Sequence, residues 1–276
     1  MRYVFVFWCL LAAPLSISAS ILAQFRTSLG DMQVELYDES KPITVQNFIR
    51  YVREGYTNNM IVHRWHEGDI HVIQGGGYFV ADRGTTNQRI KGIETTFPAI
   101  TNEYGAGRLF SNTYGTIAMA RVSGQTNSAT SQWFINVTDN VGLDQVDGGF
   151  TVFGKVVGGT NVLEIFKQAS TNSGVYKLFV DFFLPEVPVR SPDPDYGDLL
   201  FVDVSLLDVH VRPTTEGLSE ISWQSVSNKV NRVEFTPQFP PVWTELFTTN
   251  GTGSLIQYVD PQPGATNRFY RVRVDY

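Results

Sequence analysis

The chain has 276 residues and a formal net charge of −6 at pH 7, with 42% hydrophobic and 17% charged residues. The surplus of acid argues against nucleic-acid binding, which depends on Lys and Arg. The composition is that of a globular protein rather than a disordered one, and the length allows one large or two modest domains.

The first twenty residues, MRYVFVFWCLLAAPLSISAS, have the pattern of a secretory signal peptide. Arg2 gives a positive start, an apolar run extends from Val4 to Leu15, and Ser18 and Ser20 suit the −3 and −1 positions of a cleavage site. We therefore expect residues 1–20 to be a signal peptide and the mature protein to be exported, either periplasmic or secreted. An uncleaved membrane anchor is the alternative, although the run is short for a bilayer span.

Cleavage after residue 20 would remove the chain's one cysteine, Cys9, together with Arg2, so the net charge would change from −6 to −7. A mature chain without thiols or disulfides depends on its hydrophobic core for stability, and this one is large enough to have such a core. No later apolar run approaches bilayer length, so we expect no membrane span in the mature chain.

Two helices are predicted among many short strands. Residues 24–37 predict a β-hairpin that turns at residues 29–31, because apolar residues then alternate along one face. Residues 41–55, KPITVQNFIRYVREG, predict the clearest helix, with apolar residues at i, i+3, i+4 and i+7. A shorter helix is predicted over 161–168, and LLFVDVSLLDV (199–209) predicts a closing strand. The pattern indicates a mainly β protein, an antiparallel barrel with helices over its ends.

A boundary is predicted near Arg212-Pro213-Thr214, and the rest of the chain has a different organisation. Turn residues such as Asn250-Gly251 separate short segments that alternate in polarity. Five strands are expected: SEISWQS, NRVEFTP, PVWTELFTT, SLIQYVD and RFYRVRVDY. This pattern favours a small β-sandwich-like domain over residues 213–276, whose role the sequence leaves open.

Three segments of the first domain carry the motifs that indicate a function. They are VHRWHEGDIHVIQGGGY (62–78), NTYGTIAMARVSGQTNSATSQWFINVTDN (112–140) and GLDQVDGGFTVFGKVVGG (142–159). Together they resemble the cyclophilin family of peptidyl-prolyl isomerases, in particular its bacterial branch, and the resemblance covers about residues 24–210. It implies an eight-stranded antiparallel barrel capped by two helices, isomerisation of X–Pro bonds, proline-containing polypeptides as partners and no cofactor or metal.

The resemblance also implies roles for individual residues. Arg64 matches the catalytic arginine, and Gln74 matches the glutamine that orients the arginine and the substrate backbone. The positions that match the substrate groove are Gln132, Phe134, Ala120, Leu143, Val72, His71 and Phe150. Gln132 and Phe134 share a face of their strand, so Trp133 and Ile135 are expected to fill the space behind them.

Several positions depart from the family pattern. Gln74 follows Arg64 by ten positions, where the family has eight, and His71 and Val72 stand where it has Phe and Met. A more polar pocket wall is therefore expected at His71. Gly142 stands where cyclosporin-sensitive members carry Trp, and many members carry His at the position of Phe150, so weak cyclosporin binding is expected.

Other functions were weighed against isomerisation. The histidines of 63–71, with Glu67 and Asp69, match no strong metal-ligand spacing, and Gly75-Gly76-Gly77 lacks the Lys-Ser/Thr of a phosphate loop. A hydrolase would need a nucleophile motif such as G-x-S-x-G, which is not in the sequence. The rival that stays open is a proline-peptide binding module with little or no turnover, tethered to a surface or a protein partner by its C-terminal domain.

Overall fold

The computed structural model describes residues 21–57, 59–94, 96–168, 174–207, 209–225, 230–238, 241–252, 254–262 and 268–275. The predicted signal peptide, residues 1–20, lies outside them. No helix in this described part of the chain combines the length and the apolarity that a membrane crossing needs.

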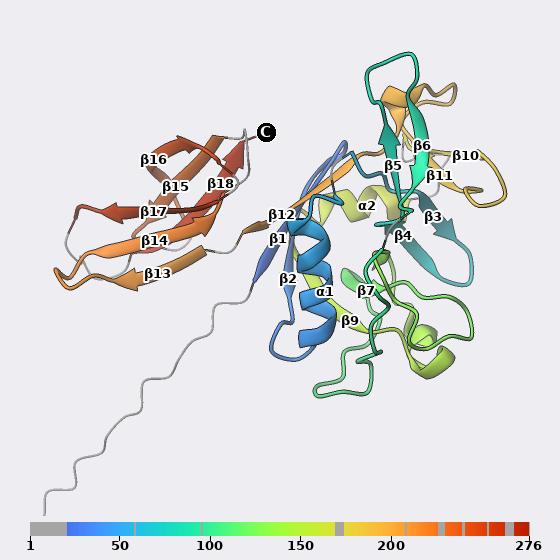
Figure 1. The fold of residues 1–276 in the computed structure, drawn as a ribbon, viewed down its shortest axis with the longest axis horizontal. Coiled ribbons are helices and arrows are strands. Elements are labelled where there is room, and N and C mark those ends of the chain that lie inside the picture. Colours follow the sequence, from blue (N-terminus) through green and yellow to red (C-terminus); the bar gives the residue numbers. More distant parts are fainter. Residues whose placement is uncertain are drawn as a thin grey trace, which may run out of the picture.

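The N-terminal unit is built around one antiparallel sheet of eight strands. The sheet order is β12-β1-β2-β9-β7-β8-β4-β3. The bounds are β1 Leu22–Thr27, β2 Gly30–Leu36, β3 Arg64–Glu67, β4 His71–Gly75, β7 Thr116–Met119, β8 Trp133–Asn136, β9 Val152–Gly158 and β12 Val202–Leu207. Just before β3 and β12 the chain pairs with itself, since Val62 N donates to Leu200 O and Val202 N to Met60 O. The curled sheet is thus closed beside its two outer strands, and the expected mainly β, cyclophilin-like barrel is confirmed (Figure 1).

Two α-helices add their apolar faces to the core inside the sheet. They are α1 Pro42–Arg53 and α2 Asn161–Lys167, within the two predicted ranges. Phe48 of α1 and Phe166 of α2 are buried among Phe25, Trp133 and other side chains of the main core. Burial of such large apolar groups is the main force that holds helix to sheet.

The first hairpin differs slightly from its prediction. Thr27 pairs with Gly30, so the connection is Ser28–Leu29, and Gly30 is already part of β2. Gly30 has φ of 132°, a conformation that costs a glycine little, which explains why the turn sits one residue earlier than residues 29–31.

Two further hairpins and three 3₁₀ turns extend from the barrel. The hairpins are β5 Tyr78–Ala81 with β6 Arg89–Gly92, and β10 Tyr176–Leu178 with β11 Val187–Val189. The 3₁₀ turns are η1 Val141–Asp144, η2 Val146–Gly148 and η3 Tyr196–Asp198. A second apolar cluster that includes Val80, Leu184 and Phe201 anchors both hairpins to the barrel. The sequence analysis assigned no role to either hairpin.

The C-terminal unit consists of two three-stranded sheets, β13-β14-β17 and β16-β15-β18. The bounds are β13 Val209–Pro213, β14 Ser219–Gln224, β15 Val230–Thr236, β16 Thr244–Asn250, β17 Leu255–Asp260 and β18 Phe269–Asp275. Its own core contains Ile221, Trp223, Val233 and Val272. Because β13 pairs with β14, the unit includes a sixth strand that precedes the predicted start at residue 213.

Candidate active site

The register of the sheet aligns three of the predicted site residues, Arg64, Gln74 and Phe134, in one row that continues across five strands. Arg64 of β3 pairs with Gln74 of β4, and Gln74 pairs with Phe134 of β8. Phe134 pairs with Ala118 of β7, which pairs with Val152 of β9. Directly paired residues place their Cβ atoms about 4.5–5.5 Å apart on one face. The row therefore brings together side chains that are up to 88 residues apart in the sequence (64 to 152).

A cavity of about 190 Å³ opens on this row. It is lined by Arg64, Ile70, Val72, Gln74, Ala120, Arg121, Phe134, Leu143 and Phe150. The rings of Phe134 and Phe150 meet edge to face at 5.7 Å between centroids, and Phe134 is only 5% exposed. The floor is apolar, and one edge carries the guanidinium and the amide. This combination suits a small apolar ring joined to a polar backbone.

The neighbours of Phe134 point the other way, as expected. Trp133 and Ile135 belong to the main core, whereas Phe134 belongs to a separate cluster at the pocket. Gln132 does not line the cavity. Its Oε1 accepts a hydrogen bond of 2.7 Å from Nε2 of Gln74, so Gln132 supports the pocket amide from the side.

The prediction that His71 lines the pocket is wrong in this structure. Along β4 alternate side chains share a face, so Val72 and Gln74 face the cavity and His71 faces the opposite side. There the Nε2 of His71 accepts a hydrogen bond of 3.2 Å from Nε1 of the buried Trp65. Burial lowers the pKa of His71, in keeping with a neutral, accepting imidazole.

Ile70 completes the wall instead, and the sequence analysis missed it. It precedes Val72 by two residues, as Val72 precedes Gln74, so the same alternation could have identified it. The extra residues of the β3–β4 turn form the loop between Glu67 and His71 and place Ile70 at the cavity. The wall is therefore apolar, not polar as expected.

Arg121, the last residue of the Met-Ala-Arg motif, was also missed. Its guanidinium lies 4.2 Å from the centroid of the Phe150 ring. Its terminal nitrogens donate to backbone carbonyls, including those of Val146 and Gly149. These bonds tie the loop that carries Leu143 and Phe150 to the end of β7, so Arg121 shapes the pocket rim.

Leu143 is held over the pocket by a buried network of amides. Asn140 donates through Nδ2 to the carbonyl of His71 and to Oδ1 of Asn136, at 3.0 and 2.8 Å, and its Oδ1 accepts from the backbone N–H of His71 at 2.9 Å. Since the backbone N–H of Leu143 donates to Asn140 O, the turn η1 is fastened directly to β4. Each buried amide is satisfied within this network, as a stable interior requires.

Arg64 is held by Glu186, a residue outside all of the motifs. Nε of Arg64 lies 3.3 Å from a Glu186 oxygen, and the carbonyl of Glu186 accepts from the backbone N–H of Trp65 at 2.8 Å. The same carboxylate contacts Nδ1 of His66 at 3.0 Å. Glu186 immediately precedes β11, so the β10–β11 hairpin supplies the group that orients the guanidinium. Nothing in the sequence motifs points to this pair.

His63, which precedes Arg64, is buried and neutral. Burial, with the charge of Arg64 second, lowers the pKa of His63 to about 3, although a hydrogen bond with Gln132 opposes the shift. The imidazole packs against the Tyr78 ring at 4.9 Å and is 4% exposed. His63 therefore supports the pocket from behind rather than exchanging protons with a substrate.

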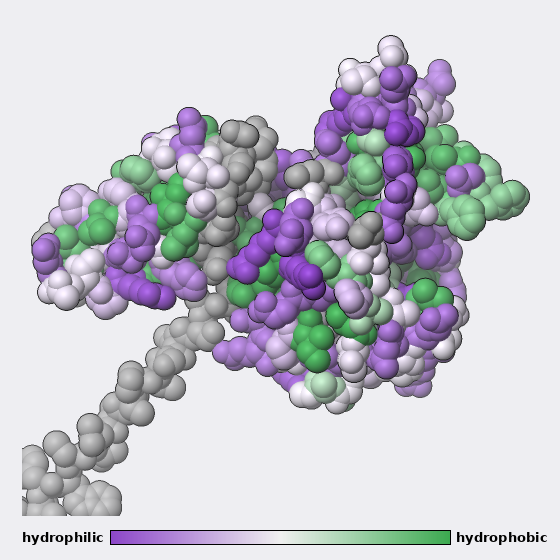
Figure 2. All heavy atoms as spheres, viewed as in Figure 1, coloured by the Kyte–Doolittle hydropathy of each residue, from purple (hydrophilic) through white to green (hydrophobic). Residues whose placement is uncertain are grey.

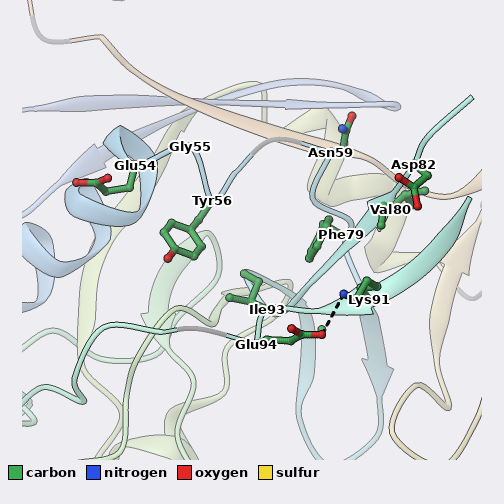
Figure 3. A pocket seen from close by; sticks show the side chains of 12 residues that line it. Glu54, Gly55, Tyr56, Asn59, Phe79, Val80, Asp82, Lys91, Ile93 and Glu94 are labelled. Carbon is green, nitrogen blue, oxygen red and sulfur yellow. Dashed lines mark ion pairs between the residues drawn. The ribbon is translucent and has the colours of Figure 1, made fainter.

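A larger cavity, of about 710 Å³, lies apart from the row and is lined by none of the predicted residues. It opens between the end of α1 and the β5–β6 hairpin, with Tyr56, Phe79 and Ile93 on its walls (Figure 3). Its lysine, Lys91, is ion-paired with Glu94 at 3.0 Å. Over the described residues, no group of three or more His, Cys, Asp or Glu side chains could hold a metal ion.

Comparison with known proteins identifies the family of the N-terminal unit. The family model for the cyclophilin type peptidyl-prolyl cis-trans isomerase matches residues 22–189. This chain belongs to the cyclophilin family. The C-terminal unit lies beyond the matched residues.

Curated relatives carry the same activity in their names. A peptidyl-prolyl cis-trans isomerase of Acinetobacter baylyi is 37% identical over 174 residues, 62% of this chain and 83% of the relative. Isomerase A of Dickeya dadantii is 42% identical over 154 residues, 55% of this chain and 74% of the relative. Isomerase B of Escherichia coli is 38% identical over 162 residues, 56% of this chain and 90% of the relative. The predicted resemblance is confirmed, and the chain is a cyclophilin-type isomerase.

Proposed function

We propose that this isomerase accelerates X–Pro rotation in other proteins as they fold outside the cytoplasm. The observation that carries the proposal is the row Arg64, Gln74 and Phe134 at a cavity of about 190 Å³ whose floor is apolar. Export is the second part of the proposal, and it is supported by the signal-like pattern of residues 1–20.

The reaction needs no covalent intermediate, because only a rotation must be eased. The barrier of about 18–20 kcal/mol comes from amide resonance, and at its top the prolyl nitrogen regains a localised lone pair. A guanidinium that donates a hydrogen bond to this nitrogen stabilises the twisted amide over both planar forms. In this chain Arg64 supplies that donor from the edge of the pocket, while its Nε is engaged by Glu186.

The remaining groups hold the substrate in place. Phe134, Leu143 and Val72 form the apolar cup for the proline ring. Gln74, with Nε2 bonded to Gln132, presents its Oε1 to a substrate N–H. The energy of binding the flanking backbone holds the rotating X–Pro bond in the orientation that the reaction needs.

The rival function, a binding module without turnover, is not favoured. It was motivated by a more polar pocket wall at His71 and by the extra C-terminal domain, and Ile70 and Val72 occupy that wall instead. The C-terminal unit stays without an assigned partner.

A proline-peptide isomerisation assay tests the proposal. We expect Arg64→Ala to lower kcat/KM at least 100-fold, about 2.7 kcal/mol of transition-state stabilisation. Arg64→Lys, which keeps the charge but not the planar fork, should retain more activity. Exposed Arg53 offers a matched control in Arg53→Ala, expected within twofold of wild type. Equal rates for wild type and Arg64→Ala would refute the proposal.

Export is tested by expression of the full chain with a C-terminal tag, fractionation of the cells and sequencing of the N-terminus. We expect an extracytoplasmic product that starts at Ile21. A full-length product in the cytoplasmic fraction would contradict export while leaving the isomerase activity untouched.

A further inference from the structure

The β10–β11 hairpin ends in a tip of exposed phenylalanines. Phe182, Phe183 and Phe179 are 92%, 82% and 61% exposed, and Val180 beside them is exposed as well. Figure 2 shows green, hydrophobic atoms gathered on the right-hand projection where Figure 1 draws the β10–β11 connection. Single exposed apolar residues are ordinary, but a cluster of large ones marks an interaction surface.

The tip is built to keep these rings outside. Oδ1 of Asp181 accepts hydrogen bonds from the backbone N–H groups of Phe183 and Leu184, at 2.7 and 2.9 Å, which fixes the turn. Leu184 points inward, is 3% exposed and belongs to the second apolar cluster. The rings of Phe179 and Phe182 meet edge to face at 6.1 Å between centroids. The tip is thus a defined platform.

The platform lies within reach of the proline pocket. The base of the hairpin carries Glu186, whose carboxylate lies 3.3 Å from Nε of Arg64. Phe182 precedes Glu186 by four residues, so their Cα atoms are at most about 14 Å apart. An extended polypeptide of about five to eight residues can therefore touch the tip while its proline occupies the pocket.

The charge of the hairpin distinguishes between the partners that an exposed apolar tip could bind. The hairpin carries Asp181 and Glu186, and its lysine, Lys177, is ion-paired with Glu67 at 2.8 Å. The whole chain has a net charge of −6. An anionic membrane surface recruits Lys and Arg, which the tip does not offer.

We propose that the tip, residues 179–183, binds apolar segments of unfolded polypeptides beside the proline pocket. This inference rests on the proposed isomerase function, and it deepens it by naming the client class: chains with aromatic or aliphatic residues about five to eight positions from a proline. Folded proteins, which bury such residues, are poor clients.

Direct binding tests the tip independently of catalysis. The probe is a labelled, proline-free twelve-residue peptide of Leu, Phe and Ser, titrated with the full chain, beside a peptide in which Ser replaces every Leu and Phe. Phe182→Ser/Phe183→Ser should weaken binding of the apolar peptide at least tenfold. The control Ile43→Ser/Val157→Ser removes two exposed apolar residues elsewhere in the same unit and should stay within twofold.

The outcomes separate the tip from the pocket. If Arg64→Ala is as active as wild type but the peptide result stands, the proposed catalytic role fails and the tip survives. Equal peptide affinity for wild type and the Phe182→Ser/Phe183→Ser variant would overturn the inference. Two other results would also overturn it if the apolar peptide does not bind. One is sedimentation with phosphatidylcholine vesicles that the Phe182→Ser/Phe183→Ser variant loses, and the other is a dimer in ultracentrifugation that the same variant loses.

Discussion

Arg64 depends on a carboxylate that approaches it from outside the sheet. Its motif partners, Gln74 and Gln132, lie on β4 and at the start of β8, whereas Glu186 comes from a hairpin that packs beside β3. A guanidinium with one fixed edge loses less freedom when it binds the twisted amide than one that samples many rotamers. Glu186 is therefore a positioning residue for Arg64.

Glu186→Gln keeps the size of the side chain and removes its charge. We expect kcat/KM to fall about three- to tenfold. The loss should lie in kcat, and KM should change less than twofold because the pocket itself is intact. The control is Glu94→Gln, which removes a carboxylate from the ion pair at the larger cavity. A change in KM alone would show that Glu186 acts on substrate binding instead.

The acid limb of the activity profile gives a second test of Glu186. Burial would raise the pKa of Glu186, but hydrogen bonding and charge from His66, then Arg64 and Lys177, bring it below the ordinary value of 4.5. The carboxylate is thus ionised above pH 4.5, and its contribution is lost as the pH falls through the lowered value. Wild-type kcat should fall in that acid range more steeply than that of Glu186→Gln, measured by exchange NMR on a proline peptide. Parallel profiles would exclude the role.

His63 connects the site to stability. Its pKa is about 3 in the fold and about 6.5 when exposed, so the unfolded chain takes up a proton first as the pH falls below 6.5. The free energy of unfolding should therefore decrease between pH 6.5 and 5.5 by about 1 kcal/mol from this group. Urea unfolding of His63→Gln should show a shallower decrease than wild type. Equal slopes for the two proteins would contradict the buried, neutral state.

Gly142 bears on inhibitor binding. A Cβ at this position meets no heavy atom within 4 Å, so a side chain can begin there without a clash in the turn η1. Wild type should bind cyclosporin weakly, and Gly142→Trp should lower the inhibition constant at least tenfold through a new aromatic contact. Titration of isomerase activity measures both, and sub-micromolar inhibition of wild type would refute the expectation.

At the scale of the element, the three glycines after Gln74 explain how β4 can lie flat against β8. A Cβ on Gly75 would lie 2.5 Å from the Trp133 ring, and one on Gly77 would lie 2.7 Å from Cδ of Gln132. Gly76 has φ of 82°, and its Cβ would strike the carbonyl oxygen of Ser131. The triplet is a packing device that sets the position of Gln132 and Phe134, consistent with the absence of a phosphate motif.

Gly76→Ala should accordingly be severe. The strained φ and the backbone clash together predict a loss of about 2–4 kcal/mol in the free energy of unfolding. The atoms that the new Cβ would meet first, Ser131 O and Gln132 Cα, belong to the backbone and cannot rotate away. Gly105→Ala, where a Cβ meets nothing within 4 Å, is the matched control and should change stability little. A Gly76→Ala variant as stable as that control would mean that β4 and β8 can separate at no cost.

The elements also show where sequence reasoning succeeds and where it stops. Periodicity and motifs were enough to predict the barrel, both helices and the row from Arg64 to Phe134, because these depend on local alternation and on family order. His71 was misplaced because it was assigned by counting back three positions from Gln74, whereas the alternation along β4 puts Ile70, Val72 and Gln74 on one face. Glu186 could not be predicted, since its contact with Arg64 joins residues 122 positions apart.

At the scale of the whole molecule, the chain forms two units, each with its own main core. Every residue of the row and pocket belongs to the N-terminal unit, whereas β13–β18 enclose their own core around Trp223. Figure 1 shows the β13–β18 unit set beside the barrel, continuing from β12. Few contacts join strands of the N-terminal unit to strands of the C-terminal unit, which is the pattern of separable domains.

Ending the chain after residue 208 should therefore leave the catalytic unit intact. We expect it to keep kcat/KM for a short proline peptide within about twofold, because β12 is retained and no pocket residue is removed. Ending it after residue 200 instead removes β12, whose Val202 and Val204 are buried in the main core, and should abolish the fold. Far-UV circular dichroism and the peptide assay on both chains measure this difference. If the chain that ends at residue 208 folds but loses most of its activity, the C-terminal unit takes part in catalysis. The assignment of catalysis to the N-terminal unit alone would then be wrong.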